Sequence, residues 1–113
     1  MKKGEVWKVN LNPTIGDEIK KSRPCVIVSN DMMGKLPLKI VVPLTGWKDS
    51  FDNAPWHVKV NPSAENGLSK TCSADTFQVR SISDQRLVKK LGFLPRPVVD
   101  QIESGLAVCL DLD

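Results

Sequence analysis

Short runs of alternating or continuous apolar residues, separated by polar turns, occupy most of the chain. These runs predict strands over residues 5–11, 24–28, 38–45, 56–60, 68–74 and 75–82. In the last run, the alternation predicts Phe77, Val79 and Ile82 on the core side. Pro and Gly interrupt residues 12–18, which are therefore predicted to form a loop.

The run Cys25–Val28 is entirely apolar and rich in β-branched residues, which predicts a strand buried on both faces. Pro24 fixes φ at its start, and a polar turn follows it. Arg23 thus stands at the mouth of a rigid strand, beside a polar loop. Such a place suits a fixed positive charge held against an anion, although an arginine there is also a common solvated surface residue.

Helical spacing appears near the C-terminus, where Val98, Ile102, Leu106 and Leu110 recur every four residues. They predict an amphipathic helix of about four turns that packs on the sheet or at a dimer contact. Residues 83–87 predict the start of another helix, and residues 91–94 a strand-like segment. The predicted fold is therefore mainly β (α+β): a small, twisted antiparallel barrel with a C-terminal helix.

Composition fits one domain spanning residues 1–113, with 41% hydrophobic and 26% charged residues. No apolar run is long enough to cross a membrane and no signal segment is recognisable, so we expect a cytoplasmic protein. Three widely spaced cysteines and a single histidine, His57, favour neither a disulfide framework nor a zinc site. No glycine-rich phosphate loop is present, and we expect no metal and no cofactor.

Charge is unevenly distributed along the chain, although the net charge is only +3. Residues 1–50 hold nine Lys and Arg against five Asp and Glu, whereas residues 51–113 hold seven against eight. The positive excess lies in the half that contains Arg23, as an anion-binding face requires.

Several short motifs occur together in one order: Gly4–Trp7, Leu11–Pro13, Gly16–Glu18, Arg23–Asp31, Pro43–Thr45 and Gln78–Ile82. In this order the chain resembles the PemK/MazF family of toxin endoribonucleases from type II toxin–antitoxin systems. The resemblance runs from Gly4 to about Leu87. It implies an SH3-like (CcdB-like) barrel with a C-terminal helix, a homodimer, and metal-independent, sequence-specific cleavage of single-stranded RNA, commonly mRNA. It also implies a cognate antitoxin that neutralises the activity.

The resemblance further implies roles for particular residues. Arg23 matches the family's catalytic arginine before the proline, and Thr45 matches its catalytic threonine. RNA contacts are expected from residues of the preceding loop and of the later motif, namely Asp17, Glu18, Lys20, Lys21, Gln78 and Arg80. Many relatives carry an acidic residue immediately before that glutamine, where this chain has Phe77.

The chemistry of these groups fits RNA cleavage without metal. RNA supplies its own nucleophile in the 2′-OH. The Arg23 guanidinium can donate a planar fork of hydrogen bonds to two phosphate oxygens, and the Thr45 hydroxyl can donate one. The general base stays unassigned, because arginine does not readily lose a proton and the position of His57 favours a structural or rim histidine over a catalytic one.

Alternatives remain open at this point. Trp47 and Phe51 are suited to stacking on RNA bases, to anchoring their own loop, or to binding the antitoxin. A non-catalytic barrel that acts by protein binding, as in a gyrase-poisoning relative of this fold, is the alternative function. A module that binds RNA without cleaving it is a third.

Overall fold

A coiled antiparallel sheet with one helix makes up the protein. The computed structural model describes residues 1–112, so Asp113, the last residue of the predicted domain, lies outside the described residues. The strands are β1 (Glu5–Asn10), β2 (Ser22–Ile27), β3 (Leu38–Gly46), β4 (His57–Val60), β5 (Cys72–Asp75), β6 (Arg80–Ser83) and β7 (Leu87–Phe93). Helix α1 (Arg96–Leu110) follows, and the 3₁₀ turns are η1 (Asp31–Met33), η2 (Asp49–Asn53), η3 (Thr76–Gln78) and η4 (Asp84–Arg86).

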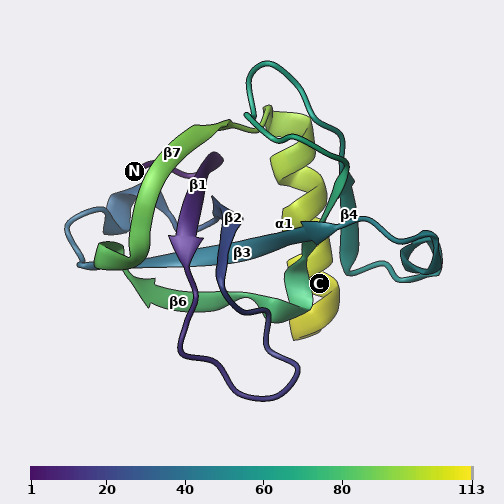
Figure 1. The fold of residues 1–113 in the computed structure, drawn as a ribbon, viewed down its shortest axis with the longest axis horizontal. Helices are drawn as coiled ribbons and strands as arrows, with labels where there is room; N and C mark the ends of the chain where they lie inside the picture. Colours follow the sequence, from purple (N-terminus) through teal and green to yellow (C-terminus); the bar gives the residue numbers. More distant parts are fainter. Residues whose placement is uncertain (113) are drawn as a thin grey trace.

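The strands follow the order β4-β5-β3-β2-β1-β7, and β6 pairs with β3. Strand β2 lies on one edge of β3, and both β5 and β6 lie on the other edge. Along that edge, β6 pairs with the first part of β3 and β5 pairs with its last part. Figure 1 shows β7 arching over β1, while β3 runs across the whole sheet. Within the described residues the ladder does not join β4 to β7, so the mainly β prediction is confirmed as an open, curled sheet.

Two hydrophobic clusters lie on opposite sides of strand β2, the strand that the sequence predicts to be buried on both faces. Val26 belongs to a cluster with Val42 and the helix residue Ile102, whereas Cys25 and Ile27 belong to a second cluster. All three β2 side chains are buried, as predicted for a strand covered on both faces. The position of β2 is therefore fixed by packing from above and below.

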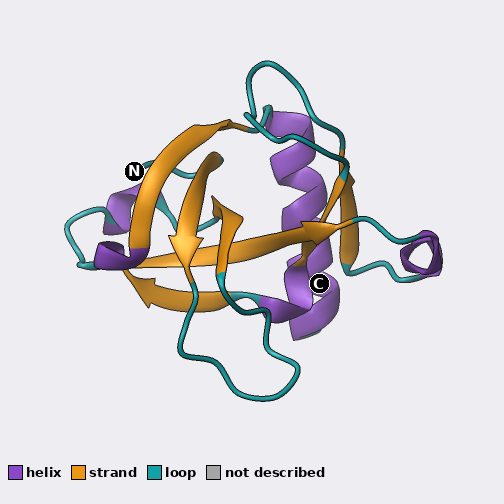
Figure 2. Ribbon diagram, viewed as in Figure 1, coloured by secondary structure: helices purple, strands orange, loops and turns teal. Residues whose placement is uncertain are grey.

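Helix α1 begins at Arg96, with Pro95 as its N-cap and Pro97 in its first turn, and its buried residues are Val99, Ile102 and Gly105. It lies against the sheet beside β4 (Figure 2). The predicted helix is confirmed, but Leu110, at the end of the predicted stripe, is exposed. At Gly105 the helix comes close to η3, because a Cβ built there would lie 2.9 Å from Thr76 Cγ2.

Two predictions from the pattern are wrong. Residues 75–82 do not form one strand, because η3 interrupts the alternation and turns Phe77 outward, where it is 70% exposed. Residues 83–87 do not start an α-helix. Ser83 does cap, accepting a hydrogen bond from the Gln85 amide, but the capped element is the single turn η4, and β7 follows directly.

Within residues 1–112, none of the helices is both long and apolar enough to span a membrane.

We expect Gly105→Val to lower the free energy of unfolding by about 1–3 kcal/mol, because the added methyl groups overpack the contact with Thr76. Urea denaturation followed by circular dichroism measures the change. Gln101→Ala, on the exposed side of the same helix, is the matched control and should alter stability little. An unchanged stability for Gly105→Val would contradict the close contact.

Glu5 ties the N-terminal segment to the sheet. Burial alone would raise its pKa, but hydrogen bonds from Trp7 Nε1, the Lys2 amide and Lys90 outweigh burial and lower the pKa from 4.5 to about 2. A carboxylate with a lowered pKa in the folded state stabilises it above the unfolded-state pKa.

Glu5→Gln should therefore lower the free energy of unfolding at pH 7 by about 1 kcal/mol. The difference from wild type should stay constant down to about pH 5 and shrink as the pH falls from 4.5 to 2. Denaturation series at several pH values test this, with Glu65→Gln as the control on an exposed carboxylate. A difference that persists undiminished at pH 2 would be inconsistent with the lowered pKa.

Candidate anion-binding site

Arg23 and Thr45 lie on the same face of neighbouring strands. The ladder between β2 and β3 ends at the pair Cys25–Pro43. Arg23 is two residues before Cys25 and Thr45 is two residues after Pro43, so both side chains share the face of that pair. Beyond the last pair the other edge of β3 is occupied by β5, where Thr45 stands opposite Ser73. Strand alternation therefore predicts Arg23 and Thr45 on one side of the sheet, whereas Arg23 also lines a hollow with Leu44 and Gly46, from which Thr45 is absent.

The positive charges of two guanidinium groups influence the pKa of the buried Cys25 thiol. Burial raises the pKa of Cys25 to about 12, while the positive charges of Arg80 and Arg23 oppose that rise. Arg80 enters from β6, where it pairs with Val41 of β3. Strands β2 and β6 flank β3 on opposite edges, and both arginine side chains donate hydrogen bonds to the backbone of the loop between β1 and β2. The chemical capacity of such a pair is to hold an anion.

The loop between β1 and β2 lies over this face and is held by Gln78. The Gln78 side chain accepts a hydrogen bond from the Ile19 amide (3.1 Å) and donates one to the Asp17 carbonyl (3.0 Å). Ile19 also packs against the second core cluster. Figure 1 shows this loop extending from the ends of β1 and β2 beside β6.

Arginines bind the carbonyls at the start of the same loop. Arg80 Nη1 donates to the Leu11 carbonyl (3.2 Å), and Arg86 donates to the carbonyls of Asn10 and Asn12. Arg23 Nε donates to the Lys20 carbonyl at the other end (3.0 Å). Each of these arginines therefore uses at least one of its N–H donors to bind the backbone of the loop.

A hollow of about 260 Å³ lies between this loop and η3. Its lining residues are Glu18, Ile19, Pro43, Phe77, Gln78, Val79 and Arg80. Three residues predicted to bind RNA, Glu18, Gln78 and Arg80, are thus brought together. Pro43, on the face of Arg23 and Thr45, joins the hollow to the predicted catalytic pair.

The remaining predicted contact residues lie along the loop itself. Asp17, Lys20 and Lys21 are exposed and do not line the hollow. Lys21 has a positive φ of 72°, and its amide donates to Asn12 Oδ1 (3.1 Å), which closes the base of the loop. Thr45 is half-buried and also lies outside the lining of the hollow.

Trp47 and Phe51 pack against their own part of the sheet. The Phe51 ring stacks on His57 with centroids 3.7 Å apart, and Trp47 meets Phe51 edge to face at 5.6 Å. Lys59 Nζ lies 5.1 Å from the Trp47 ring centre. Of the three uses left open by the sequence, these contacts favour anchoring the loop to β4.

His57 has a buried polar neighbour. Its Nδ1 lies 2.7 Å from Ser73 Oγ, and Ser73 stands directly opposite Thr45. Asp75 is the cross-strand partner of His57, and its buried Oδ1 has no hydrogen-bond partner among the described residues. Sequence patterning missed Ser73, because a serine inside a short strand carries no distinctive signal.

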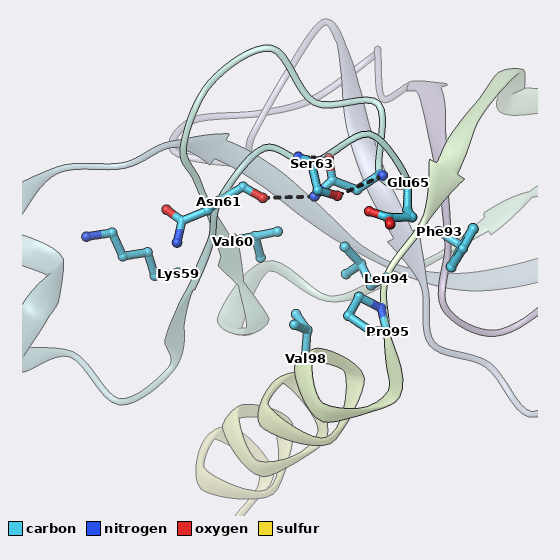
Figure 3. Close-up of a pocket in the computed structure, with 10 residues that line it drawn as sticks. Lys59, Val60, Asn61, Ser63, Glu65, Phe93, Leu94, Pro95 and Val98 are labelled. Carbon is cyan, nitrogen blue, oxygen red and sulfur yellow. Dashed lines mark hydrogen bonds between the residues drawn. The ribbon is translucent and has the colours of Figure 1, made fainter.

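A larger hollow, of about 440 Å³, lies elsewhere, between the end of β7 and the start of α1. Figure 3 shows Leu94, Pro95 and Val98 facing the turn that contains Ser63 and Glu65. Its lining has no arginine and includes one lysine, Lys59, which points away from the centre. Of these two hollows, the one beside Arg80 is the better candidate for binding an anion. A third hollow, of about 260 Å³, is lined by Arg23 and Lys70.

Comparison with known proteins identifies the family of this chain. The family described as PemK-like, MazF-like toxin of type II toxin-antitoxin system matches residues 2–110. The protein is a member of this family. The resemblance stated from the sequence motifs is thereby confirmed, and the match leaves only four residues of the chain outside it.

Individual PemK/MazF proteins are similar along their whole length. Endoribonuclease MazF9 of Mycobacterium tuberculosis is 32% identical over 118 residues, covering 99% of this chain and 98% of the relative. The fold is similar to a crystal structure of MazF from Deinococcus radiodurans, with a TM-score of 0.79, 23% identity and coverage of 98% and 96%. It is also similar to an endoribonuclease in complex with its cognate antitoxin from Mycobacterial species, with a TM-score of 0.78, 20% identity and coverage of 100% and 97%.

We expect Gln78→Ala to speed hydrogen exchange at the Ile19 amide roughly fivefold, because one hydrogen bond worth about 1 kcal/mol is lost. Exchange measured by NMR at residue resolution tests this. Gln85→Ala, an exposed glutamine in η4, is the control and should leave the loop unchanged. Equal exchange in both variants would argue against the role of Gln78 in holding the loop.

Proposed function

We propose that this protein is an endoribonuclease toxin that cleaves single-stranded RNA, commonly mRNA, and that a cognate antitoxin neutralises it. Membership of the PemK/MazF family supports the toxin role, and the similar M. tuberculosis relative is named an endoribonuclease. The observation that carries the proposal is that Arg23 and Arg80 both bind the backbone of the loop between β1 and β2, through the Lys20 and Leu11 carbonyls.

The proposed reaction uses the nucleophile of the substrate. The 2′-oxygen attacks the adjacent phosphorus, so the O2′–P bond forms and the P–O5′ bond breaks. One proton leaves the 2′-OH and one reaches the departing 5′-oxygen. The products are a 2′,3′-cyclic phosphate and a 5′-OH. A divalent metal is not required for this route, because the nucleophile is already in place and guanidinium groups can neutralise the phosphorane.

In this proposal Arg23 and Thr45 act on the reacting phosphate. Arg23 Nε is engaged by the Lys20 carbonyl, which orients the guanidinium and leaves its two Nη groups for phosphate oxygens. Thr45 donates its hydroxyl to a further oxygen. The residues proposed to contact the rest of the RNA are Asp17, Glu18, Lys20, Lys21, Gln78 and Arg80.

The assembly and location are also proposed. The chain acts as a single domain, residues 1–113, in the cytoplasm and as a homodimer. The solved complex of an endoribonuclease with its cognate antitoxin supports an antitoxin as the protein partner. No cofactor takes part in the proposed reaction.

Arg23→Ala and Thr45→Ala should each lower the rate of RNA cleavage by about 10²–10³-fold, because each removes one preorganised donor at the transition state. Cleavage of a long single-stranded RNA by purified protein measures the rate. Arg96→Ala and Thr71→Ala are matched controls outside the site, and both should cleave like wild type. Wild-type activity in Arg23→Ala would overturn the proposed role of Arg23.

Cleavage should continue at an unchanged rate in excess EDTA, because the proposed charge stabilisation comes from side chains. End-group analysis of the fragments should find 5′-OH termini and, at early times, 2′,3′-cyclic phosphates. Loss of cleavage in EDTA, restored by added Mg²⁺, would contradict the metal-independent route. RNA that is bound but left intact by the wild-type protein would instead favour a binding module.

A further inference from the structure

Phe77 is the exposed aromatic of the proposed site. Its side chain is 70% exposed, and it lines the hollow that also contains Gln78 and Arg80. A single exposed apolar ring is common on protein surfaces, but a ring on the wall of a hollow that also holds Arg80 gains favourable burial when a flat apolar ligand covers it. Its position between the loop and η3 therefore calls for an occupant with an apolar, flat surface.

The backbone that presents Phe77 is rigidly held. Thr76 is fully buried, and both its amide (3.1 Å) and its hydroxyl (2.7 Å) donate to the Trp56 carbonyl. Gly105 of α1 packs directly on the Thr76 side chain, and the Val79 amide closes the turn on the Thr76 carbonyl. The backbone beneath the ring is therefore preorganised, so stacking of a ligand orders only the two side-chain torsions of Phe77.

Other aromatics near the site are already used. Phe51 is stacked on His57, and Trp47 packs against Phe51 and Lys59. Phe77 has no ring partner among the described aromatics. It is therefore the aromatic in the lining of this hollow with a surface available for a nucleobase.

We propose that Phe77 is the stacking platform for one unpaired RNA base beside the scissile phosphate, and that it helps to set which sequence is cut. This inference rests on the proposed function. The positive charge of Arg80 attracts the RNA backbone to the same hollow, and unpaired bases of single-stranded RNA stack readily on aromatic side chains. Gln78 and Glu18 lie in the same lining. Gln78 already binds the Ile19 amide and the Asp17 carbonyl, so its contact with the edge of the stacked base uses its second amide hydrogen.

Binding to a non-cleavable RNA, with a 2′-deoxynucleotide at the cleaved position, tests the stacking role. Phe77→Ala should weaken binding roughly 5- to 150-fold, the range for loss of one base–aromatic stack. Phe77→Trp should bind like wild type, because it keeps the flat surface. Phe93→Ala removes another exposed phenylalanine, remote from this hollow, and should also bind like wild type. Wild-type affinity in Phe77→Ala would overturn the proposal.

The sequence-setting role has its own readout. Across a set of RNAs that vary at single positions around the cut, Phe77→Ala should flatten the differences in cleavage rate at one position. A 2-aminopurine placed at that position should be quenched on binding to wild type and Phe77→Trp, but not to Phe77→Ala. An unchanged rate profile, or quenching that persists in Phe77→Ala, would contradict a stacked base.

Competing occupants give different results. If a second copy of the chain or the antitoxin covers Phe77, then Phe77→Ala should reduce self-association or antitoxin affinity while RNA binding stays at the wild-type level, and that result would overturn the inference. Arg23→Ala separates this outcome from failure of the proposed function. If the inference alone fails, Arg23→Ala still abolishes cleavage, whereas if the proposed function fails, the wild-type protein does not cleave RNA at all.

Discussion

Burial of β2 on both faces is the constraint on which the rest of the structure depends. Val26 packs toward the helix, and Cys25 and Ile27 pack toward the opposite cluster, so the strand cannot shift by one residue without exposing an apolar side chain on each side. Arg23 stands at the start of this strand, and its register is inherited from the pairing of Cys25 with Pro43. The placement of the positive charge is thus a consequence of core packing.

The same strand shows what the sequence could predict. A continuous β-branched run has few structural options, so residues 24–28 and the helical stripe after residue 95 were predicted correctly. The same local signals, taken in their order along the chain, also predicted the mainly β fold and the family. The structure and the family match confirm both predictions. Family motifs also led to Arg23, Gln78 and Arg80, which the structure gathers around one loop and one face, although their proposed roles still await experiment.

Other features depend on contacts that are distant in sequence. The alternation around Phe77 predicted a buried ring, but Thr76 is drawn inward by the Trp56 carbonyl and by Gly105, and the turn that results reverses the expected face. Likewise, nothing local to Gln78 indicates that its amide will hold Asp17 and Ile19, about sixty positions earlier in the chain. Tertiary packing decided both outcomes over local propensity.

The thiol of Cys25 has a consequence for the charge of the site. Its pKa of about 12 keeps it protonated at every physiological pH, even though two arginines lie close enough to favour the anion. A thiolate there would form an internal ion pair and cancel one unit of the attraction felt by an incoming polyanion. Because peroxide oxidises the thiolate and not the neutral thiol, this cysteine is also shielded from oxidants. Cys25 therefore adds no negative charge to this face.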